Sequence, residues 1–268
     1  MSDKMYDVII VGASAEGVEL CDYLRTKAGN LSIAFISKNF DNATKYDFSG
    51  IDLIKGEAVV SSYNHGLIGF QLKNRVSVFG KAAVIATGSR PAKLTTFKSN
   101  NLYYKPSEIT EPAKNKQAVV YGNGEDAIKY ALEISKKFKY IYLCSNTFDL
   151  TSNQKLIKKL DNVANILHLP SCNIVSIKND KTGNLQEVTL DTYDTIRCAA
   201  LVLALGRAPD VSGISKKMLE VDADGFAVTK EFNESTKVPS IYVVGACAKK
   251  NTKQSIHAVG NKIIERRQ

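Results

Sequence analysis

The residues with the clearest chemical meaning are glycines that follow short apolar segments. Residues 9–17 read I-I-V-G-A-S-A-E-G, in which Gly12 and Gly17 fit the outer glycines of a G-x-G-x-x-G fingerprint while Ser14 takes the middle place. Such a turn directs backbone N–H groups and a helix N-terminus at a phosphate, and its middle position normally lacks a side chain so that a pyrophosphate can approach the backbone. The pattern predicts a dinucleotide-binding turn with an altered middle position.

A second turn of the same kind lies further along the chain. Residues 118–131 read A-V-V-Y-G-N-G-E-D-A-I-K-Y-A, where Gly122, Gly124 and Ala127 form G-x-G-x-x-A. This version is closer to the ideal fingerprint than the first. The alternative interpretation is structural, because glycines of this kind can also serve only to tighten a strand-to-helix turn.

The elements that must position these turns also occur twice, in the same order. Each turn is followed by a segment with helical periodicity, a buried β-rich segment, a hairpin-like stretch and an apolar segment that leads to Gly, Arg and Pro. The buried β-rich segments are 31–36 and 140–144. The hairpin-like stretches are 51–78 and 173–197, with turns near 64–66 and 179–184. The apolar segments that lead to Gly, Arg and Pro are 82–91 and 199–209. We therefore predict an α/β fold with a duplicated nucleotide-binding unit built on parallel strands.

The bulk composition is that of an ordinary globular protein, with 268 residues of which 44% are hydrophobic and 24% charged. No apolar run is long enough to span a bilayer, and the N-terminus lacks the apolar core of a signal peptide, so we expect a cytoplasmic protein without a membrane partner. The formal charge of +9 comes from lysines in several segments rather than one stripe. A solvated surface, or steering of an acidic protein or anionic cofactor, is favoured over nucleic acid binding, because no nucleic-acid motif accompanies the charge.

The five cysteines are dispersed, and none forms a C-x-x-C pair. This pattern indicates reduced thiols that are mostly buried as small apolar residues. The three histidines are far apart in the sequence and not close to cysteine pairs. No metal site is predicted.

The order of these features resembles that of the pyridine nucleotide-disulfide oxidoreductases, and most closely the low-molecular-weight thioredoxin reductases and related reductases of ferredoxin or flavodoxin. Two further segments carry the resemblance. T-K-V-P-S-I-Y-V-V-G-A-C at 236–247 is similar to the family's T-x-x-P-x-(aromatic)-A-x-G-D strand, and K-Q-S-I-H-A-V-G at 253–260 is similar to its R-Q-x-x-x-A-x-G helix start. The matching stretches are 7–37, 85–91, 118–145, 201–210 and 236–260.

The resemblance implies two Rossmann-like nucleotide-binding domains of three ββα layers, the second inserted into the first. An FAD-binding domain would comprise residues 1–103 and 223–268, and an NAD(P)-binding domain residues 104–222, with turn-rich crossings at 104–112 and 222–225. It also implies FAD and NADPH or NADH as cofactors, and a homodimer.

The resemblance further implies which positions contact the cofactors. For FAD these are Gly12, Ser14, Gly17, Ser37, Thr87, Gly88, Gly245, Ala246 and Gln254, and for the nicotinamide cofactor they are Gly122, Gly124 and Ala127. No catalytic side chain is assigned, because the protein would supply orientation more than acid–base chemistry. Cys247 is either a surrogate redox centre near the flavin or, as we expect, a buried strand-end residue, and His257 is either a proton donor or a packing residue.

Several departures from the family pattern weaken the expected contacts with the cofactors. Ser37 replaces the carboxylate that binds the adenosine ribose, and Ala246 replaces the aspartate of the Gly-Asp pair. Residues 38–50 form a much shorter segment than the one that wraps the flavin ring in relatives, and residues 143–146 lack the arginine pair of NADPH users. Glu16 places a negative charge inside the first turn, which is unfavourable beside a pyrophosphate unless the side chain points outward.

One departure concerns the electron route. Residues 103–116, where thioredoxin reductases of the family place a redox C-x-x-C, contain no cysteine. A dithiol relay to thioredoxin is therefore not expected. The leading hypothesis is an FAD-dependent oxidoreductase that passes electrons from a nicotinamide cofactor to an external acceptor such as a small acidic redox protein. The alternatives are a non-catalytic binding or regulatory protein that has lost one or both cofactors, and a protein in which only the second turn binds an adenine nucleotide.

Overall fold

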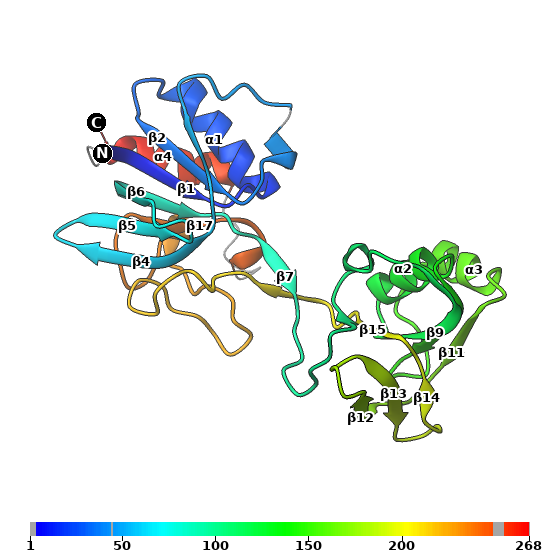
Figure 1. Cartoon of the computed structure of the whole chain (residues 1–268). Coiled ribbons are helices and arrows are strands. Elements are labelled where there is room, and N and C mark those ends of the chain that lie inside the picture. The colour runs from blue at the N-terminus through cyan, green and yellow to red at the C-terminus, as the bar shows by residue number, and fades with distance from the viewer. Residues whose placement is uncertain (1–3, 44, 249–254, 268) are drawn as a thin grey trace. The chain divides into compact units, whose positions relative to one another are not determined.

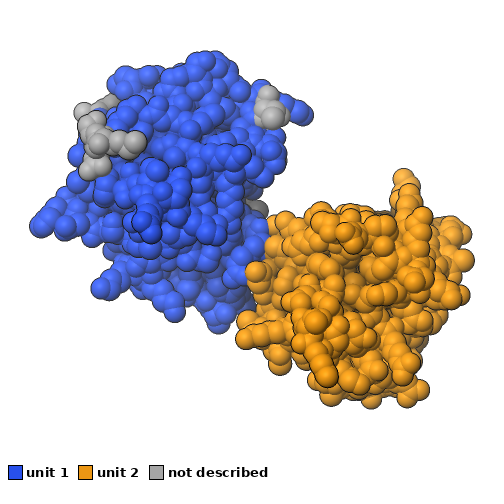
Figure 2. Space-filling view, viewed as in Figure 1, with its two compact units in different colours: residues 1–90, 208–268 blue, residues 91–207 orange. Residues whose placement is uncertain are grey.

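The structure, a computed structural model, describes residues 4–43, 45–248 and 255–267 (Figure 1). The chain forms two compact units (Figure 2): unit 1 consists of Met1–Arg90 and Ala208–Gln268, and unit 2 is Pro91–Arg207. The second unit is therefore inserted into the first, as the family resemblance implied.

The chain passes between the units through β7 (Ser89–Pro91) and β16 (Arg207–Pro209), which pair with each other. The chain changes unit after Arg90 and again after Arg207, earlier in the sequence than the boundaries expected at 103/104 and 222/223. Both changes occur at the end of an apolar segment that leads to Gly, Arg and Pro. The turn-rich segment at 222–225 lies within unit 1, where the Gly225 N–H donates to Asp222 O at 3.0 Å.

Unit 1 is built on a seven-stranded sheet. In order across the sheet its strands are β3 (Asp52–Lys55), β2 (Ile33–Ser37), β1 (Met5–Val11), β6 (Ser77–Ile85), β5 (Leu67–Leu72) and β4 (Ala58–Asn64), with β17 (Ile241–Val243) also paired to β6. Residues 77–80 of β6 pair antiparallel with β5, whereas residues 83–85 pair parallel with β17. The hairpin β4–β5 turns at 65–66 as predicted, but β3, expected in that hairpin, joins the parallel strands beside β2.

Helices α1 (Ala15–Lys27) and α4 (Ile256–Glu265) cover one face of the parallel strands (Figure 1). Because successive side chains of a strand point to opposite faces, β1 contributes to two cores. Val8 and Ile10 pack with the helices, and Ile9 packs on the other face with side chains of β5 and of the segment 211–248. The described part of the unit also contains the short 3₁₀ helices η1 (Asp41–Ala43), η3 (Glu231–Asn233) and η4 (Gly245–Cys247).

Unit 2 repeats the plan with three layers. Its five-stranded parallel sheet has the order β11 (Ile166–Leu169), β10 (Phe138–Cys144), β9 (Ala113–Tyr121), β15 (Ala200–Leu203) and β8 (Leu102–Tyr103). Helices α2 (Glu125–Ile134) and α3 (Gln154–Asp161) cover one face, the antiparallel strands β12 (Ile174–Asn179), β13 (Leu185–Leu190) and β14 (Ile196–Arg197) cover the other, and η2 spans Pro106–Glu108 (Figure 1). This arrangement confirms the predicted ββα layers and the hairpin at 173–197.

In sheets of this kind ligands bind at the carboxyl ends of parallel strands. In each unit the predicted glycine turn connects the C-terminus of a central strand, β1 or β9, to the N-terminus of the next helix.

Among the described residues, no helix combines the length and the apolar character that crossing a membrane requires.

Candidate functional site

The glycines of the first turn allow unusually close packing of backbone on backbone. Gly12 has φ +100°, and a Cβ atom built on it would lie 2.5 Å from Ala86 O. A Cβ on Gly17 would lie 2.5 Å from Gly12 O. Real Cβ atoms do not approach that closely, so both positions require glycine for α1 to begin directly behind the turn.

Ser14, at the middle position of the fingerprint, is the N-cap of α1. Its Oγ accepts a hydrogen bond from the Gly17 N–H at 3.2 Å. The N–H groups of Ala15 and Glu16 find no acceptor among the described residues. These two groups point out of the N-terminus of a 13-residue helix, where the backbone favours an anion. The turn thus fits a diphosphate in spite of its serine.

The end of β2 presents a hydroxyl to the same turn. Ser37 is almost fully buried, and its Oγ accepts from the Ala13 N–H at 3.3 Å. The following residue, Lys38, is bound to Glu57 at 2.8 Å. The position that would hold a ribose diol therefore carries one hydroxyl that is already engaged with the turn.

Thr87 and Gly88 lie beside this turn and anchor the returning chain. Thr87 Oγ1 donates to Asp210 O, and the Asp210 N–H donates to Gly88 O at 3.0 Å. Gly88 has φ +70°, and a Cβ on it would lie 3.6 Å from Ser14 Cβ. The role of Asp210 was not predicted, because the pairing spans more than a hundred residues of sequence.

The turn after β17 closes the site in unit 1. Gly245 has φ +78°, and a Cβ built on it would lie 2.7 Å from Glu16 Oε2. Ala246 is exposed and has no side-chain acceptor. Gln254 lies outside the described residues. The predicted unit 1 residues that are described thus gather at the carboxyl edge of the sheet, and Glu16 joins them from α1.

The second turn, in unit 2, has the same construction. Gly122 has φ +155°, and a Cβ on it would lie 2.3 Å from Ala204 O and 3.2 Å from Ala127 Cβ. Ala127 is fully buried against the turn. Gly124 is the N-cap of α2, and a Cβ there would meet no atom within 4 Å. The open space above Gly124 is what a diphosphate on this turn requires.

The loop after β10 borders the second turn. The Thr151 N–H donates to Asn123 O at 2.7 Å, so the loop closes against the turn. Residues 145–153 contain one charged side chain, Asp149, and no cation. Ser145 Oγ lies 2.8 Å from His168 Nε2, and burial lowers the pKa of this histidine. The loop itself therefore provides no positive charge for a 2′-phosphate.

Cys247 and His257 have structural positions. Cys247 is buried, its Sγ donates to Val244 O at 3.2 Å, and burial raises the pKa of its thiol. The His257 ring stacks on Tyr23 with centroids 4.5 Å apart, and its Nε2 lies 3.8 Å from Glu19 Oε1. Both side chains thus support packing, Cys247 at a strand end and His257 between α4 and α1.

We expect no thiol of the folded protein to react rapidly with Ellman's reagent. All five cysteines are buried, and burial raises the pKa of Cys21 and of Cys198 to about 12, so the reactive thiolate is scarce. Titration in denaturant should release five thiols per chain. A thiol that reacts in the native protein at the rate of a free cysteine would contradict the buried positions.

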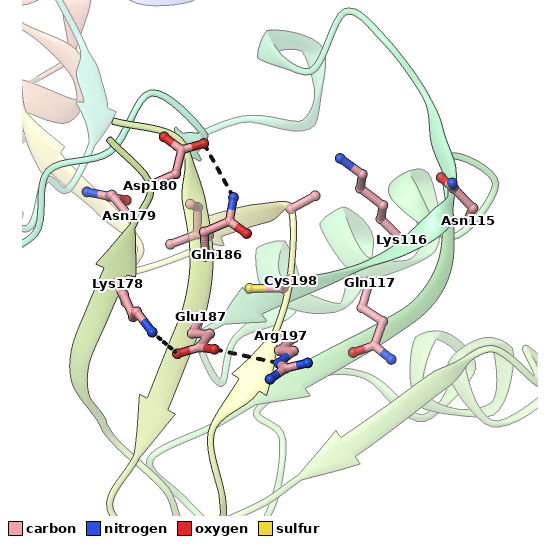
Figure 3. A pocket seen from close by; sticks show the side chains of 12 residues that line it. Asn115, Lys116, Gln117, Lys178, Asn179, Asp180, Gln186, Glu187, Arg197 and Cys198 are labelled. Atoms are coloured by element: carbon pink, nitrogen blue, oxygen red, sulfur yellow. Dashed lines mark hydrogen bonds and ion pairs between the residues drawn. The ribbon is translucent and has the colours of Figure 1, made fainter. Parts of the chain in front are cut away.

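A polar groove of about 590 Å³ lies at the opposite end of β9 from Gly122, between β9 and the hairpin β12–β13 (Figure 3). Glu187 lies between two cations, 3.3 Å from Lys178 Nζ and 3.6 Å from Arg197 Nε. Asp180 accepts from the Thr182 hydroxyl and the Asn184 N–H in the hairpin turn, which lower its pKa to about 2. Both carboxylates are thus engaged, and the groove is separate from the dinucleotide turn.

The chain is similar to known proteins in both sequence and fold. The family model of the pyridine nucleotide-disulphide oxidoreductases matches residues 27–261. Thioredoxin reductase of Mycoplasma genitalium is 26% identical over 293 residues, which cover 96% of this chain and 92% of the relative. The structure of Lactococcus lactis thioredoxin reductase has a TM-score of 0.79 at 15% identity and covers 97% of this chain and 98% of its own. Bacillithiol disulfide reductase of Bacillus cereus has a TM-score of 0.76 at 15% identity, covering 98% and 100%.

Proposed function

The chain belongs to the pyridine nucleotide-disulphide oxidoreductase family, and from this we propose that it is an FAD-dependent oxidoreductase that takes electrons from a nicotinamide cofactor and passes them to an external acceptor. The single observation that carries the proposal is the construction of the two turns. In each unit a glycine-bounded helix N-terminus stands at the carboxyl end of a central parallel strand.

We assign the FAD site to unit 1 and the nicotinamide site to unit 2. In unit 1, Gly12 and Gly17 keep the turn close to α1, and the N–H groups of Ala15 and Glu16 would bind the diphosphate. Ser14, Ser37, Thr87, Gly88, Gly245, Ala246 and Gln254 would surround the remainder of the FAD. Gly122, Gly124 and Ala127 would hold the nicotinamide dinucleotide on α2. A bound flavin accepts a hydride and can release its electrons singly or in pairs.

The acceptor differs, in our proposal, from that of a thioredoxin reductase with a C-x-x-C relay. None of the five cysteines has a partner at that spacing, and all five are buried. The charge of +9 favours an acidic partner, such as a small redox protein. The protein would act in the cytoplasm, as a homodimer.

Addition of FAD to the purified protein, followed by anaerobic titration with NADH and NADPH, tests this proposal. We expect a yellow protein with about one flavin per chain, whose visible flavin absorbance is bleached by a nicotinamide cofactor. We expect no reduction of thioredoxin disulfide under the same conditions. A protein that takes up no FAD, or a bound flavin that neither cofactor reduces, would contradict the proposed function.

A second candidate is a non-catalytic binding or regulatory protein. It is favoured by the engaged Ser37 hydroxyl and by the missing side-chain acceptor at Ala246. Each lost hydrogen bond to the ligand would weaken binding by about 1–3 kcal/mol. In this case calorimetry would detect a nicotinamide or adenine nucleotide on unit 2 and no FAD on unit 1, or no ligand on either unit.

A further inference from the structure

The carboxylate of Glu16 lies beside a turn that is distant in the sequence, the turn after β17. Glu16 is the second residue of α1, and its side chain extends to the turn after β17, where it covers Gly245. A Cβ at Gly245 would lie 2.7 Å from Glu16 Oε2 and 2.9 Å from Glu16 Cδ. The contact joins two turns that are 229 positions apart in the sequence, by the difference of their numbers.

This carboxylate has no hydrogen bond or ion pair with any described residue. It stands in the first turn of α1, where the helix dipole favours a negative charge. A half-buried carboxylate is a hydrogen-bond acceptor only, so the partner it can take is a donor such as a hydroxyl. Glu16 therefore offers an acceptor directly beside the two backbone N–H groups that we assign to the diphosphate.

The order of the strands indicates which side of the diphosphate this acceptor serves. In dinucleotide-binding sheets the adenosine ribose lies at the end of the second strand, here β2. Gly245 follows β17, and the sheet order β2-β1-β6-β17 places β17 beyond β1 and β6, away from β2. Glu16 is thus directed away from the adenosine side. The hydroxyl groups of FAD on the other side of its diphosphate belong to the ribityl chain.

We propose that Glu16 binds a ribityl hydroxyl of FAD and takes the place of a carboxylate at position 246. This inference rests on the proposed function. Ala246 is exposed and adjoins Gly245, so an aspartate there would bring its carboxylate to the neighbourhood that Glu16 now occupies. The charge inside the first turn is therefore a ligand of the cofactor and not an obstacle to it.

Measurement of FAD affinity by quenching of flavin fluorescence tests the assignment in four proteins: the wild type, E16A, E19Q and the double variant E16A/A246D. Loss of a hydrogen bond to a charged acceptor should weaken FAD binding about tenfold or more in E16A. E19Q is the matched control, because Glu19 lies on the same helix, is exposed and contacts His257. It should bind FAD like the wild type. In E16A/A246D the affinity should return toward the wild-type value.

Two further measurements separate this inference from other effects. The thermal midpoint of E16A should fall by no more than a few degrees, because a favourable charge in the first turn of a helix contributes only about 0.3–1 kcal/mol. The NADH affinity of E16A should match that of the wild type, because Glu16 belongs to unit 1 and we assign the nicotinamide site to unit 2. Wild-type FAD binding with equal or tighter binding by E16A would overturn the role of Glu16 and leave the proposed function standing, and so would failure of A246D to restore affinity. A wild-type protein that binds no FAD would overturn both.

Discussion

Replacement of Gly122 with alanine is expected to destabilise unit 2 by about 2–6 kcal/mol. Two effects add: the backbone at Gly122 has φ +155°, which L-residues rarely adopt, and the new Cβ would lie 2.3 Å from Ala204 O. Ala204 O is a backbone atom that cannot rotate away, so the ends of β9 and β15 would have to separate for the methyl group to fit. Unit 2 depends on this pairing because β9 is central in its sheet.

Gly124→Ala is the matched control for this substitution. Gly124 belongs to the same fingerprint, but a Cβ there would meet nothing within 4 Å, and its φ of −95° suits alanine. We expect a change within about 1 kcal/mol. Hydrogen exchange followed by mass spectrometry locates the effect: peptides of β9 and α2 should lose protection in G122A and keep it in G124A. Equal protection in the two variants would mean that the close approach of residue 122 to Ala204 does not require glycine.

Replacement of Glu234 with alanine is expected to destabilise unit 1 by about 3 kcal/mol at neutral pH. The Glu234 side chain is 6% exposed and forms ion pairs with Arg266 and Lys230. It also accepts from the Ser240 N–H at 2.7 Å. Arg266 is the C-cap of α4, so Glu234 ties that helix to the segment before β17. Removal of the carboxylate would leave the arginine without its main partner.

Glu234 also makes the stability of unit 1 depend on pH. Burial alone would raise the pKa of Glu234, but hydrogen bonds from Arg266, Ser240 and Lys230 outweigh it and hold the pKa below its usual value. A depressed folded-state pKa contributes stability above the unfolded-state pKa, and this contribution disappears as the pH falls through the folded value. Urea unfolding of E234Q should therefore differ from the wild type at pH 7 and converge with it in acid. E231Q, a change at an exposed glutamate of η3, the 3₁₀ helix that Glu234 follows as C-cap, should behave like the wild type throughout.

Much of the fold could be predicted because its signals are local. Apolar runs, the glycine turns and the hairpin turn at 65–66 lie within a few residues of the elements that they specify, and the duplication repeated them in order. Local signals did not specify β3, which was expected in a hairpin and instead pairs with β2. The four residues of β3 could pair in a hairpin or beside β2, and only the packing of the whole sheet selects the second arrangement.

The sequence by itself determined the two α/β units, their strand-to-helix glycine turns and the absence of a C-x-x-C pair. The tertiary structure decided where polar groups of distant segments meet. Ser37 turns its hydroxyl to Ala13, Asp210 holds Thr87, and the Glu16 carboxylate lies over Gly245. The physical reason is that a turn depends on the conformations of adjacent residues, whereas the direction of a side chain at a sheet edge depends on which strands the whole chain has brought beside it.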